Sequence, residues 1–233
     1  MGYKLTEYIG VWAIAIFLLA VLPSYTSAQS DSVGALYAQG DGGSLNFNCT
    51  ATAVERREGK IVILTAFHCA TRGTSYLISF NRRTFYPLQL WKIPHEEIDA
   101  QRFPRTHNQP KTDMAMFVME DDPRVTIIPI GDDAGLKPGQ KIIMVGYPLG
   151  ITKTHYEGIV AGRLEKPGAD SHGYVVLQIF GAPGSSGTAV IDRETKTVVG
   201  VLTGGAQAIV GTPVLFATPI SYRKYLMEVP RNK

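Results

Sequence analysis

The sequence lacks the features that mark several common classes of protein. It has only two cysteines and five histidines among 233 residues, and no two histidines have the spacing of an H-E-x-x-H motif. A structural zinc site needs about four closely placed nitrogen or sulfur ligands, so we expect no metal and no cofactor. The chain also has no repeat of fixed period and no low-complexity tract. A solenoid or fibrous architecture is therefore not expected.

An excess of charge of one sign is also missing. The formal net charge at pH 7 is only +3, and the basic residues are scattered along the chain. Binding to nucleic acid normally requires a concentrated basic surface, so we expect no nucleic-acid partner. The basic residues near the C-terminus are interpreted as a solvated face; they are Arg223, Lys224, Arg231 and Lys233.

Long apolar runs are absent except at the N-terminus. Lys4 precedes an apolar run at residues 9–22, and a stretch of small residues ends at Ala28. A membrane-spanning helix needs about 20 apolar residues, whereas a secretory signal peptide needs fewer. We therefore predict a signal peptide over residues 1–28 and a secreted or periplasmic protein with no stable membrane association after its removal. A retained membrane anchor is the alternative.

The rest of the chain has the pattern of an all-β protein. Short runs rich in Val, Ile, Thr, Tyr and Phe alternate with clusters of Gly, Pro, Asp and Asn. Strands are predicted at 34–39, 45–54, 60–66, 74–80, 84–92, 114–119, 141–146, 155–164, 173–180, 187–192, 197–203 and 213–218. Six lie on each side of residues 121–123, which predicts two six-stranded antiparallel β-barrels, at about 34–120 and about 124–218. A short C-terminal helix is predicted at 221–229.

The stretch GAPGSSGTAV, residues 181–190, looks like a turn that presents a nucleophile. Glycines on both sides permit a tight bend, and backbone N–H groups exposed there can stabilise an oxyanion. Ser186 has Gly184 two residues before it, whereas Ser185 has Pro183, which carries no N–H. We therefore predict Ser186 as the nucleophile, and the backbone N–H groups of Gly184 and Ser186 as the oxyanion hole.

A serine nucleophile needs a histidine base and a carboxylate that orients it. His68 lies just past the end of the apolar run that begins at Ile61, and Asp113 directly precedes the strand that begins at Met114. We predict a catalytic triad in the chain order His68, Asp113, Ser186. In this triad Asp113 orients His68, and His68 takes the proton of Ser186.

Four sequence boxes resemble those of trypsin/chymotrypsin-fold serine peptidases, and most closely those of the HtrA, or Deg, branch. TAFHCA resembles the TAAHC box, TDMAMFVM the DIALL box, PGSSGTAV the GNSGG box, and VGYPLGITKTHYEGIVAG the GNPxG…GIVS segment. The boxes occur in the family's order between residues 45 and 220. The resemblance implies a trypsin-like serine endopeptidase domain at 29–233 that cuts protein or peptide substrates in a cleft between its two barrels.

The two cysteines, Cys49 and Cys69, fit an exported protein. In an oxidising compartment they can close a loop whose stabilisation is worth about 3 kcal/mol. The resemblance implies this bridge, because trypsin-like enzymes attach the histidine turn to the preceding strand. Free buried thiols are the alternative if the protein is not exported.

The resemblance also implies an uncharged pocket for the substrate residue that precedes the cut. Its predicted lining is Phe180, Thr203, Gly204, Gly205 and Val214. Because none of these residues carries a charge and Phe180 and Val214 narrow the pocket, we predict cleavage after small or medium aliphatic residues.

Some residues depart from the family pattern and keep a second function open. Phe67 replaces a small residue beside the base, where it would crowd the cleft, and Ser185 stands where activated trypsins carry an aspartate. Trypsin-type zymogen activation is therefore not implied. No PDZ module is expected after the last strand, so PDZ-regulated trimer formation is not assumed and the oligomeric state is undetermined. The alternative function is a catalytically inactive binding or chaperone module on a peptidase scaffold.

One segment shows no strand pattern. Residues 92–112 are polar and include three prolines, so we predict a long loop directly before Asp113. A role in regulating access to the cleft and a simple surface insertion are both compatible with this composition.

Overall fold

The protein folds into two closed β-barrels of six strands each, as predicted. The computed structural model describes residues 30–40, 42–93, 113–164, 173–206 and 214–228. The predicted signal peptide at 1–28 and most of the predicted loop at 92–112 lie outside these residues. None of the described helices is long and apolar enough to cross a lipid bilayer.

Barrel one is formed by the N-terminal half of the chain. It comprises β1 (Val33–Gln39), β2 (Leu45–Arg57), β3 (Lys60–Thr65), β4 (Ser75–Ser79), β5 (Tyr86–Lys92) and β6 (Ala115–Glu120). All neighbouring strands pair antiparallel, in the order β1-β2-β3-β6-β5-β4. The short 3-10 helix η1 (Phe67–Thr71) directly follows β3.

Barrel two repeats this arrangement in the C-terminal half. It comprises β7 (Lys141–Gly146), β8 (Thr154–Leu164), β9 (Tyr174–Gln178), β10 (Ala189–Asp192), β11 (Val198–Ala206) and β12 (Val214–Pro219). The spatial order is β10-β11-β12-β9-β8-β7, again antiparallel throughout. The 3-10 helix η3 (Pro148–Gly150) follows β7, and the chain continues after β12 into the predicted short helix, α3 (Tyr222–Glu228).

β2 and β11 each extend three residues beyond their predicted ends, to Arg57 and Ala206, and two strands beside the predicted nucleophile turn are two residues shorter there than predicted. The strand predicted at 173–180 ends at Gln178, and the strand predicted at 187–192 begins at Ala189. Gly184 and Gly187 have φ angles of +92° and +84°, in the left-handed region that a strand does not use. The turn is therefore longer than the hydrophobic pattern indicated, because this pattern does not report backbone conformation.

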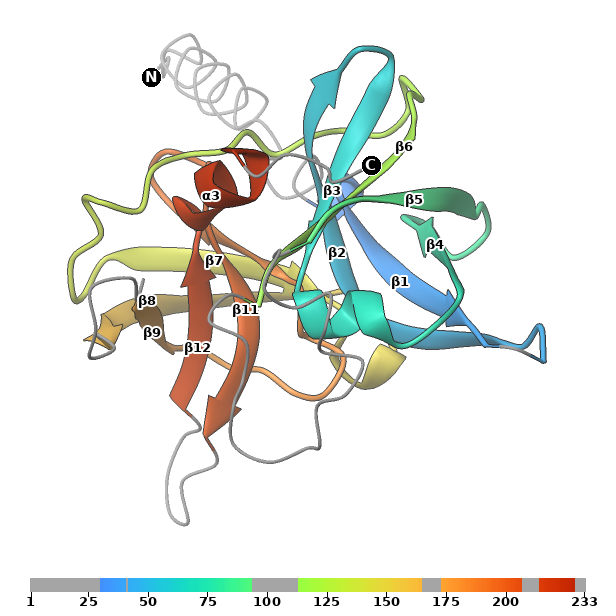
Figure 1. The fold of residues 1–233 in the computed structure, drawn as a ribbon. Helices are drawn as coiled ribbons and strands as arrows, with labels where there is room; N and C mark the ends of the chain where they lie inside the picture. The colour runs from blue at the N-terminus through green and yellow to red at the C-terminus, as the bar shows by residue number, and fades with distance from the viewer. Residues whose placement is uncertain (1–29, 41, 94–112, 165–172, 207–213, 229–233) are drawn as a thin grey trace, which may run out of the picture.

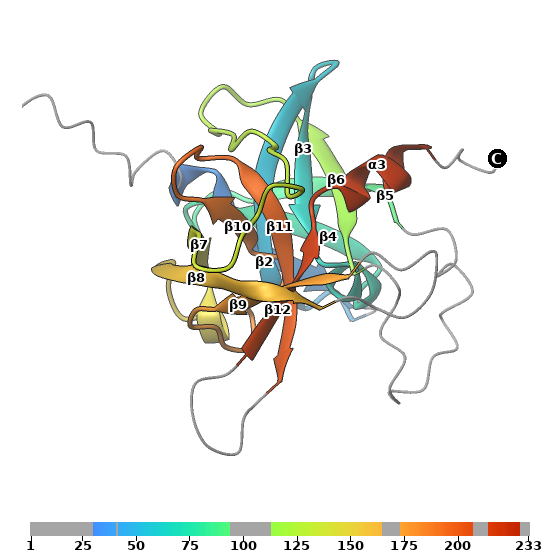
Figure 2. The same ribbon diagram turned by 90° about the vertical axis from the view of Figure 1, so that its left-hand side faces the viewer.

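The two barrels lie side by side and share an apolar core (Figures 1 and 2). β3 and β7 read as almost continuous apolar runs because both of their faces are buried. The larger core cluster joins the interior of barrel one to side chains from barrel two and α3, among them Ile143, Ala189, Val201 and Leu226. A second cluster fills barrel two, with Ile142, Met144, Leu177 and Leu202 at its centre.

Polar contacts also connect the barrels. The N–H of Ile128, in the connection between them, donates to the carbonyl of Ala53 in β2 at 2.9 Å. Arg223 of α3 pairs with Glu55 of the same strand.

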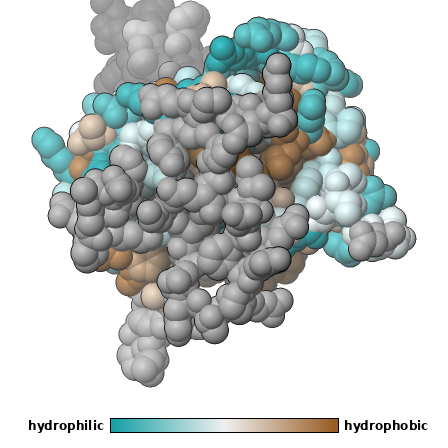
Figure 3. Space-filling model, viewed as in Figure 1, coloured by the Kyte–Doolittle hydropathy of each residue, from teal (hydrophilic) through white to brown (hydrophobic). Residues whose placement is uncertain are grey.

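On the face shown in Figure 3, hydrophilic residues cover much of the upper and right-hand surface, and hydrophobic residues are visible in smaller patches.

Candidate active site

Strand pairing in barrel one places His68 and Asp113 next to each other. Thr65, at the end of β3, is the register partner of Ala115, at the start of β6. His68 follows this pair by three positions on η1, and Asp113 precedes it by two, so both residues emerge at the same edge of the barrel. Positions separated by 45 residues in sequence thus become neighbours.

The Asp113 carboxylate contacts His68 through both of its oxygens. Oδ1 accepts the backbone N–H of His68 at 2.8 Å, and Oδ2 lies 2.6 Å from ring atom Nδ1. Asp113 is only 2% exposed, whereas the His68 side chain is 31% exposed. The carboxylate therefore fixes both the backbone and the ring of a histidine whose other edge is available to a ligand.

A disulfide joins Cys49 of β2 to Cys69 of η1, as the resemblance implied, and so attaches the histidine turn to the strand before it. Both sulfurs and a ring nitrogen of His68 lie within 4.8 Å of one another, a spacing that a metal site would also have. Metal ions bind thiolates, and sulfurs joined in a disulfide are not thiolates. Phe67, on the same turn, is buried in the core instead of crowding the cleft.

The serine turn of barrel two packs directly against barrel one. The carbonyl of Ser186 accepts the N–H of Thr50 at 3.0 Å. A β-carbon at Gly187 would lie only 2.2 Å from both the carbonyl oxygen of Thr50 and Oγ1 of Thr65. Only glycine fits this position, and its close approach places Ser186 at the edge of barrel one that carries His68.

The peptide groups around Ser186 leave two N–H donors unused. The carbonyl of Pro183 accepts the N–H of Leu149 at 2.6 Å, and the carbonyl of Ser185 accepts the N–H of Thr188 at 3.1 Å. Because N–H and C=O point in opposite directions across a trans peptide, the N–H groups that follow these carbonyls point away from those partners. They belong to Gly184 and Ser186, and within the described residues neither donates a hydrogen bond.

The residues predicted as base and nucleophile are not hydrogen-bonded to each other within the described residues. Among the described residues, the Ser186 side chain makes no hydrogen bond, to His68 or to any other group. The hydroxyl of neighbouring Ser185 instead accepts the N–H of Ala182 at 3.3 Å. The structure thus brings His68 and Asp113 into contact and holds Ser186 by its backbone. Catalytic hydrogen bonds are often long before substrate binds.

The residues predicted to line the substrate pocket lie just before the serine turn, in β11 and in β12. Thr203 is 3% exposed and donates its hydroxyl to the carbonyl of Phe216 at 3.1 Å, so it turns no free polar group outward. Phe180 is 57% exposed and lies against Tyr156, with ring centroids 5.2 Å apart. The surroundings of the predicted pocket are therefore apolar.

A residue that the sequence did not single out, Leu215, lies in the middle of this region. It pairs with Gly205 across the strands, and β-carbons at Gly205 and Gly181 would lie 2.6 and 2.7 Å from its δ-carbons. Leu215 is 6% exposed, whereas Val214, its neighbour in β12, is 39% exposed. Adjacent residues of a strand face opposite sides, and only the observed register tells which of them faces the two glycines.

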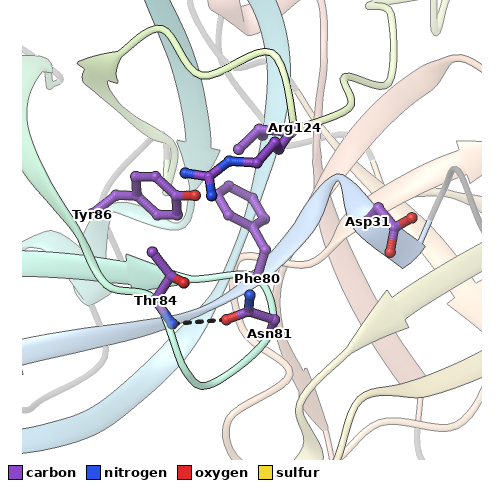
Figure 4. A pocket seen from close by; sticks show the side chains of 7 residues that line it. Asp31, Phe80, Asn81, Thr84, Tyr86 and Arg124 are labelled. Carbon is purple, nitrogen blue, oxygen red and sulfur yellow. Dashed lines mark hydrogen bonds between the residues drawn. The ribbon is translucent and has the colours of Figure 1, made fainter.

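A separate pocket opens on barrel one, and none of the predicted site residues lines it (Figure 4). Three of the polar side chains around it are paired, whereas Asp31 makes no hydrogen bond in the part of the chain that the structure describes. Asn81 accepts the N–H of Thr84 at 2.8 Å, and Arg124 and the hydroxyl of Tyr86 both bind Asp122. This pocket has no convergent free polar groups that would favour a specific ligand.

The fold and the site together define a class of protein. Two antiparallel six-stranded barrels, with an aspartate–histidine pair on one and a glycine-flanked serine turn of the other packed beside it, are the arrangement of trypsin/chymotrypsin-fold proteins. Comparison with known sequences agrees with this class. The chain belongs to the family of trypsin-like peptidase domains, which it matches over residues 49–201.

Two curated relatives carry the description "Probable periplasmic serine endoprotease DegP-like". One, from Bartonella henselae, is 26% identical over 168 residues, which is 71% of this chain and 30% of the relative. The other, from a Marinomonas species, is 31% identical over 90 residues, which is 38% of this chain and 19% of the relative. The chain thus spans less than a third of the length of either relative. Both support the predicted resemblance to the HtrA, or Deg, branch.

Solved structures share the fold at low sequence identity. The HtrA-type protease AlgW with a decapeptide superposes with a TM-score of 0.66 at 17% identity, covering 88% of this chain and 66% of AlgW. An inactive form of Rv3671c from Mycobacterium tuberculosis superposes with a TM-score of 0.61 at 15% identity, covering 89% of this chain and 90% of that structure. These likenesses concern the fold alone.

Proposed function

We propose that this chain is an exported serine endopeptidase that hydrolyses peptide bonds through Ser186, His68 and Asp113. The observation that carries the proposal is the two-point contact of the buried Asp113 carboxylate with the backbone and ring of His68. A contact of this kind selects one tautomer and one orientation of the imidazole, which a general base requires. The family membership supports the same activity.

The proposed mechanism follows from the positions of these groups. With Nδ1 of His68 directed at Asp113, Nε2 is the nitrogen left to take the proton of Ser186 as its Oγ attacks the substrate carbonyl. The unused N–H groups of Gly184 and Ser186 would receive the developing oxyanion. His68 then gives its proton to the leaving amine, and water hydrolyses the acyl-enzyme by the reverse route.

The substrate proposed here is a protein or peptide with a small or medium aliphatic residue before the cut. The support is the apolar surroundings of Phe180, Thr203, Gly204 and Gly205, together with the buried Leu215 between the two glycine segments. A charged side chain would find no partner in these surroundings, so its desolvation would be uncompensated.

Export is part of the proposal and has its own support. Residues 1–28 have the composition of a signal peptide. The Cys49–Cys69 disulfide belongs in an oxidising compartment such as the periplasm or the extracellular space. The descriptions of both curated relatives contain the word periplasmic.

A second candidate function is a catalytically inactive binding or chaperone module. The observation that favours it is the missing hydrogen bond between Ser186 and His68 within the described residues. The two candidates make opposite predictions for a reagent that reacts only with an activated serine.

The test is a fluorophosphonate probe combined with casein digestion. We expect the wild-type protein to be labelled at Ser186 and to cleave casein, and Ser186→Ala to lose both. His68→Ala should lose about 10⁴- to 10⁶-fold in turnover, as removal of a triad member does in related chemistry. Ser185→Ala is the matched control and should keep the label. A wild-type protein that is folded, unlabelled and inactive would establish the binding module instead.

A further inference from the structure

Thr50, a residue of barrel one, holds the serine turn of barrel two. It lies in β2, next to Cys49, and is 0% exposed. Its backbone N–H donates to the carbonyl of Ser186 at 3.0 Å. Its hydroxyl donates to the carbonyl of Gly184 at 2.9 Å and accepts the N–H of Tyr147 at 2.9 Å. One side chain thus binds the turn and the segment after β7 together.

The bond from the hydroxyl acts on the peptide that separates the two proposed oxyanion donors. This peptide joins Gly184 to Ser185; Thr50 binds its carbonyl, and Ala182 accepts its N–H at 2.9 Å. A planar group held at both ends cannot rotate. The fixed peptide therefore restricts the orientations of the two neighbouring peptides, which carry the N–H groups of Gly184 and Ser186.

The hydrogen bond that the Thr50 hydroxyl accepts from Tyr147 also restricts the serine turn, through the segment at 147–149. Tyr147 begins the segment that contains Leu149, and the N–H of Leu149 binds the carbonyl of Pro183 at 2.6 Å. That carbonyl belongs to the peptide whose N–H is the Gly184 donor. The Thr50 hydroxyl thus controls this donor through two routes, directly along the turn and indirectly through the segment at 147–149.

We propose that Thr50 is a positioning residue, whose hydroxyl sets the orientation of the oxyanion-hole N–H of Gly184. The inference rests on the proposed function and deepens it. Charge develops on the oxyanion mainly in the transition state, so a misdirected donor lowers kcat and leaves KM nearly unchanged. Complete loss of such a donor costs about 10²–10³ in kcat, which sets the upper limit of the expected effect.

The test compares three variants in the full chain, with kcat and KM measured on one peptide substrate. Thr50→Val keeps the shape of the side chain and removes the hydroxyl, and we expect kcat to fall at least about tenfold within the limit set by a lost donor. Thr50→Ser keeps the hydroxyl and should retain most of the activity. Thr52→Val is the matched control, because Thr52 is also 0% exposed in β2 but its hydroxyl has no hydrogen-bond partner among the described residues.

The outcomes separate this inference from the function on which it rests. If Thr50→Val is as active as Thr52→Val while Ser186→Ala is inactive, the role of Thr50 is overturned and the proposed function stands. If wild-type turnover does not depend on Ser186, both fail. Should Thr50→Val not fold, Thr50→Ala replaces it, because it also lacks the hydroxyl and adds no bulk. A Thr50→Ala protein with the wild-type kcat would likewise overturn the inference.

Discussion

At the scale of single residues, the side chain of Leu215 would determine how much space the proposed substrate pocket offers. Its δ-carbons occupy the space that β-carbons at Gly181 and Gly205 would meet, so a long substrate side chain would have to displace it. The two glycines let the backbones approach, and Leu215 then fills the gap between them. The size of the proposed pocket would therefore depend on one side chain, that of Leu215.

Leu215→Ala should therefore shift the specificity toward larger apolar residues. We expect the ratio of kcat/KM for a peptide with Phe before the cut to that for one with Ala to rise about tenfold or more, the discrimination that one or two methylene groups give. Peptide cleavage followed by mass spectrometry measures this ratio. Leu90→Ala is the matched control, since Leu90 is an exposed leucine of β5 in barrel one, outside the predicted pocket. Equal ratios in the two variants would contradict the placement of Leu215 in the pocket.

Residue-level features were only partly predictable from the sequence. His68, Asp113 and Ser186 were singled out because their sequence boxes and chain order carry chemical information. Thr50 and Leu215 were missed for different reasons. The hydroxyl of Thr50 meets the Gly184 carbonyl across 134 residues of sequence, and no local pattern reports such a contact. The role of Leu215 depends on strand register, which alternation alone does not determine.

At the scale of elements, the short turn η1 depends on its covalent attachment to β2. A 3-10 helix of five residues has few hydrogen bonds of its own, and no side chain in the described ranges caps its N-terminus. The Cys49–Cys69 bond closes the loop between them with a sequence separation of 20. The disulfide therefore restricts the unfolded chain and fixes the element that carries the proposed base, His68.

The double variant Cys49→Ala/Cys69→Ala should lose about 3 kcal/mol of unfolding free energy, because a loop of this length gains back its conformational freedom in the unfolded state. Urea unfolding followed by circular dichroism measures the loss. Reduced wild-type protein is the control and should lose a similar amount. An unchanged midpoint in both samples would show that the loop entropy is not what the disulfide contributes.

The elements themselves were predicted well. All twelve strands lie where alternating runs and turn residues indicated, because strands in a barrel bury one face or both and this burial fixes their composition. The errors lie at strand ends. β2 and β11 run three residues further than predicted, and the strands on either side of the serine turn are shorter there, because the backbone conformation of Gly184 and Gly187 overrides the hydrophobic pattern.

At the scale of the whole molecule, Tyr147 lies where the two barrels meet. It is 2% exposed, and the guanidinium of Arg82, from barrel one, lies 5.0 Å from the centre of its ring. Arg82 also donates to the carbonyl of Ile151 at 2.6 Å, so barrel one holds the segment after β7 from two directions. The interface therefore has a titratable group at its centre.

Burial raises the pKa of Tyr147 from 10.0 to about 12. The folded protein thus holds this proton more tightly than the unfolded chain, so the associated stability is complete below pH 10 and is lost between pH 10 and about 12. The lost unfolding free energy is about 2 to 3 kcal/mol, because each unit of difference between the two pKa values corresponds to about 1.4 kcal/mol. Tyr147→Phe has no group that titrates here, so its unfolding free energy should fall less than that of the wild type between pH 10 and 12. Measurements near pH 8 provide the baseline. If the unfolding free energies of wild type and variant fell equally with pH above pH 10, the prediction would be wrong.

The hydrogen bond between the Ser186 carbonyl and the Thr50 N–H has a consequence for the life of the protein in the cell. Ser186 is synthesised long after Thr50. The serine turn therefore cannot reach its folded conformation until the strands of barrel two have been synthesised and packed against barrel one. Under the proposed function, a partly synthesised chain would therefore be inactive until barrel two has folded against barrel one.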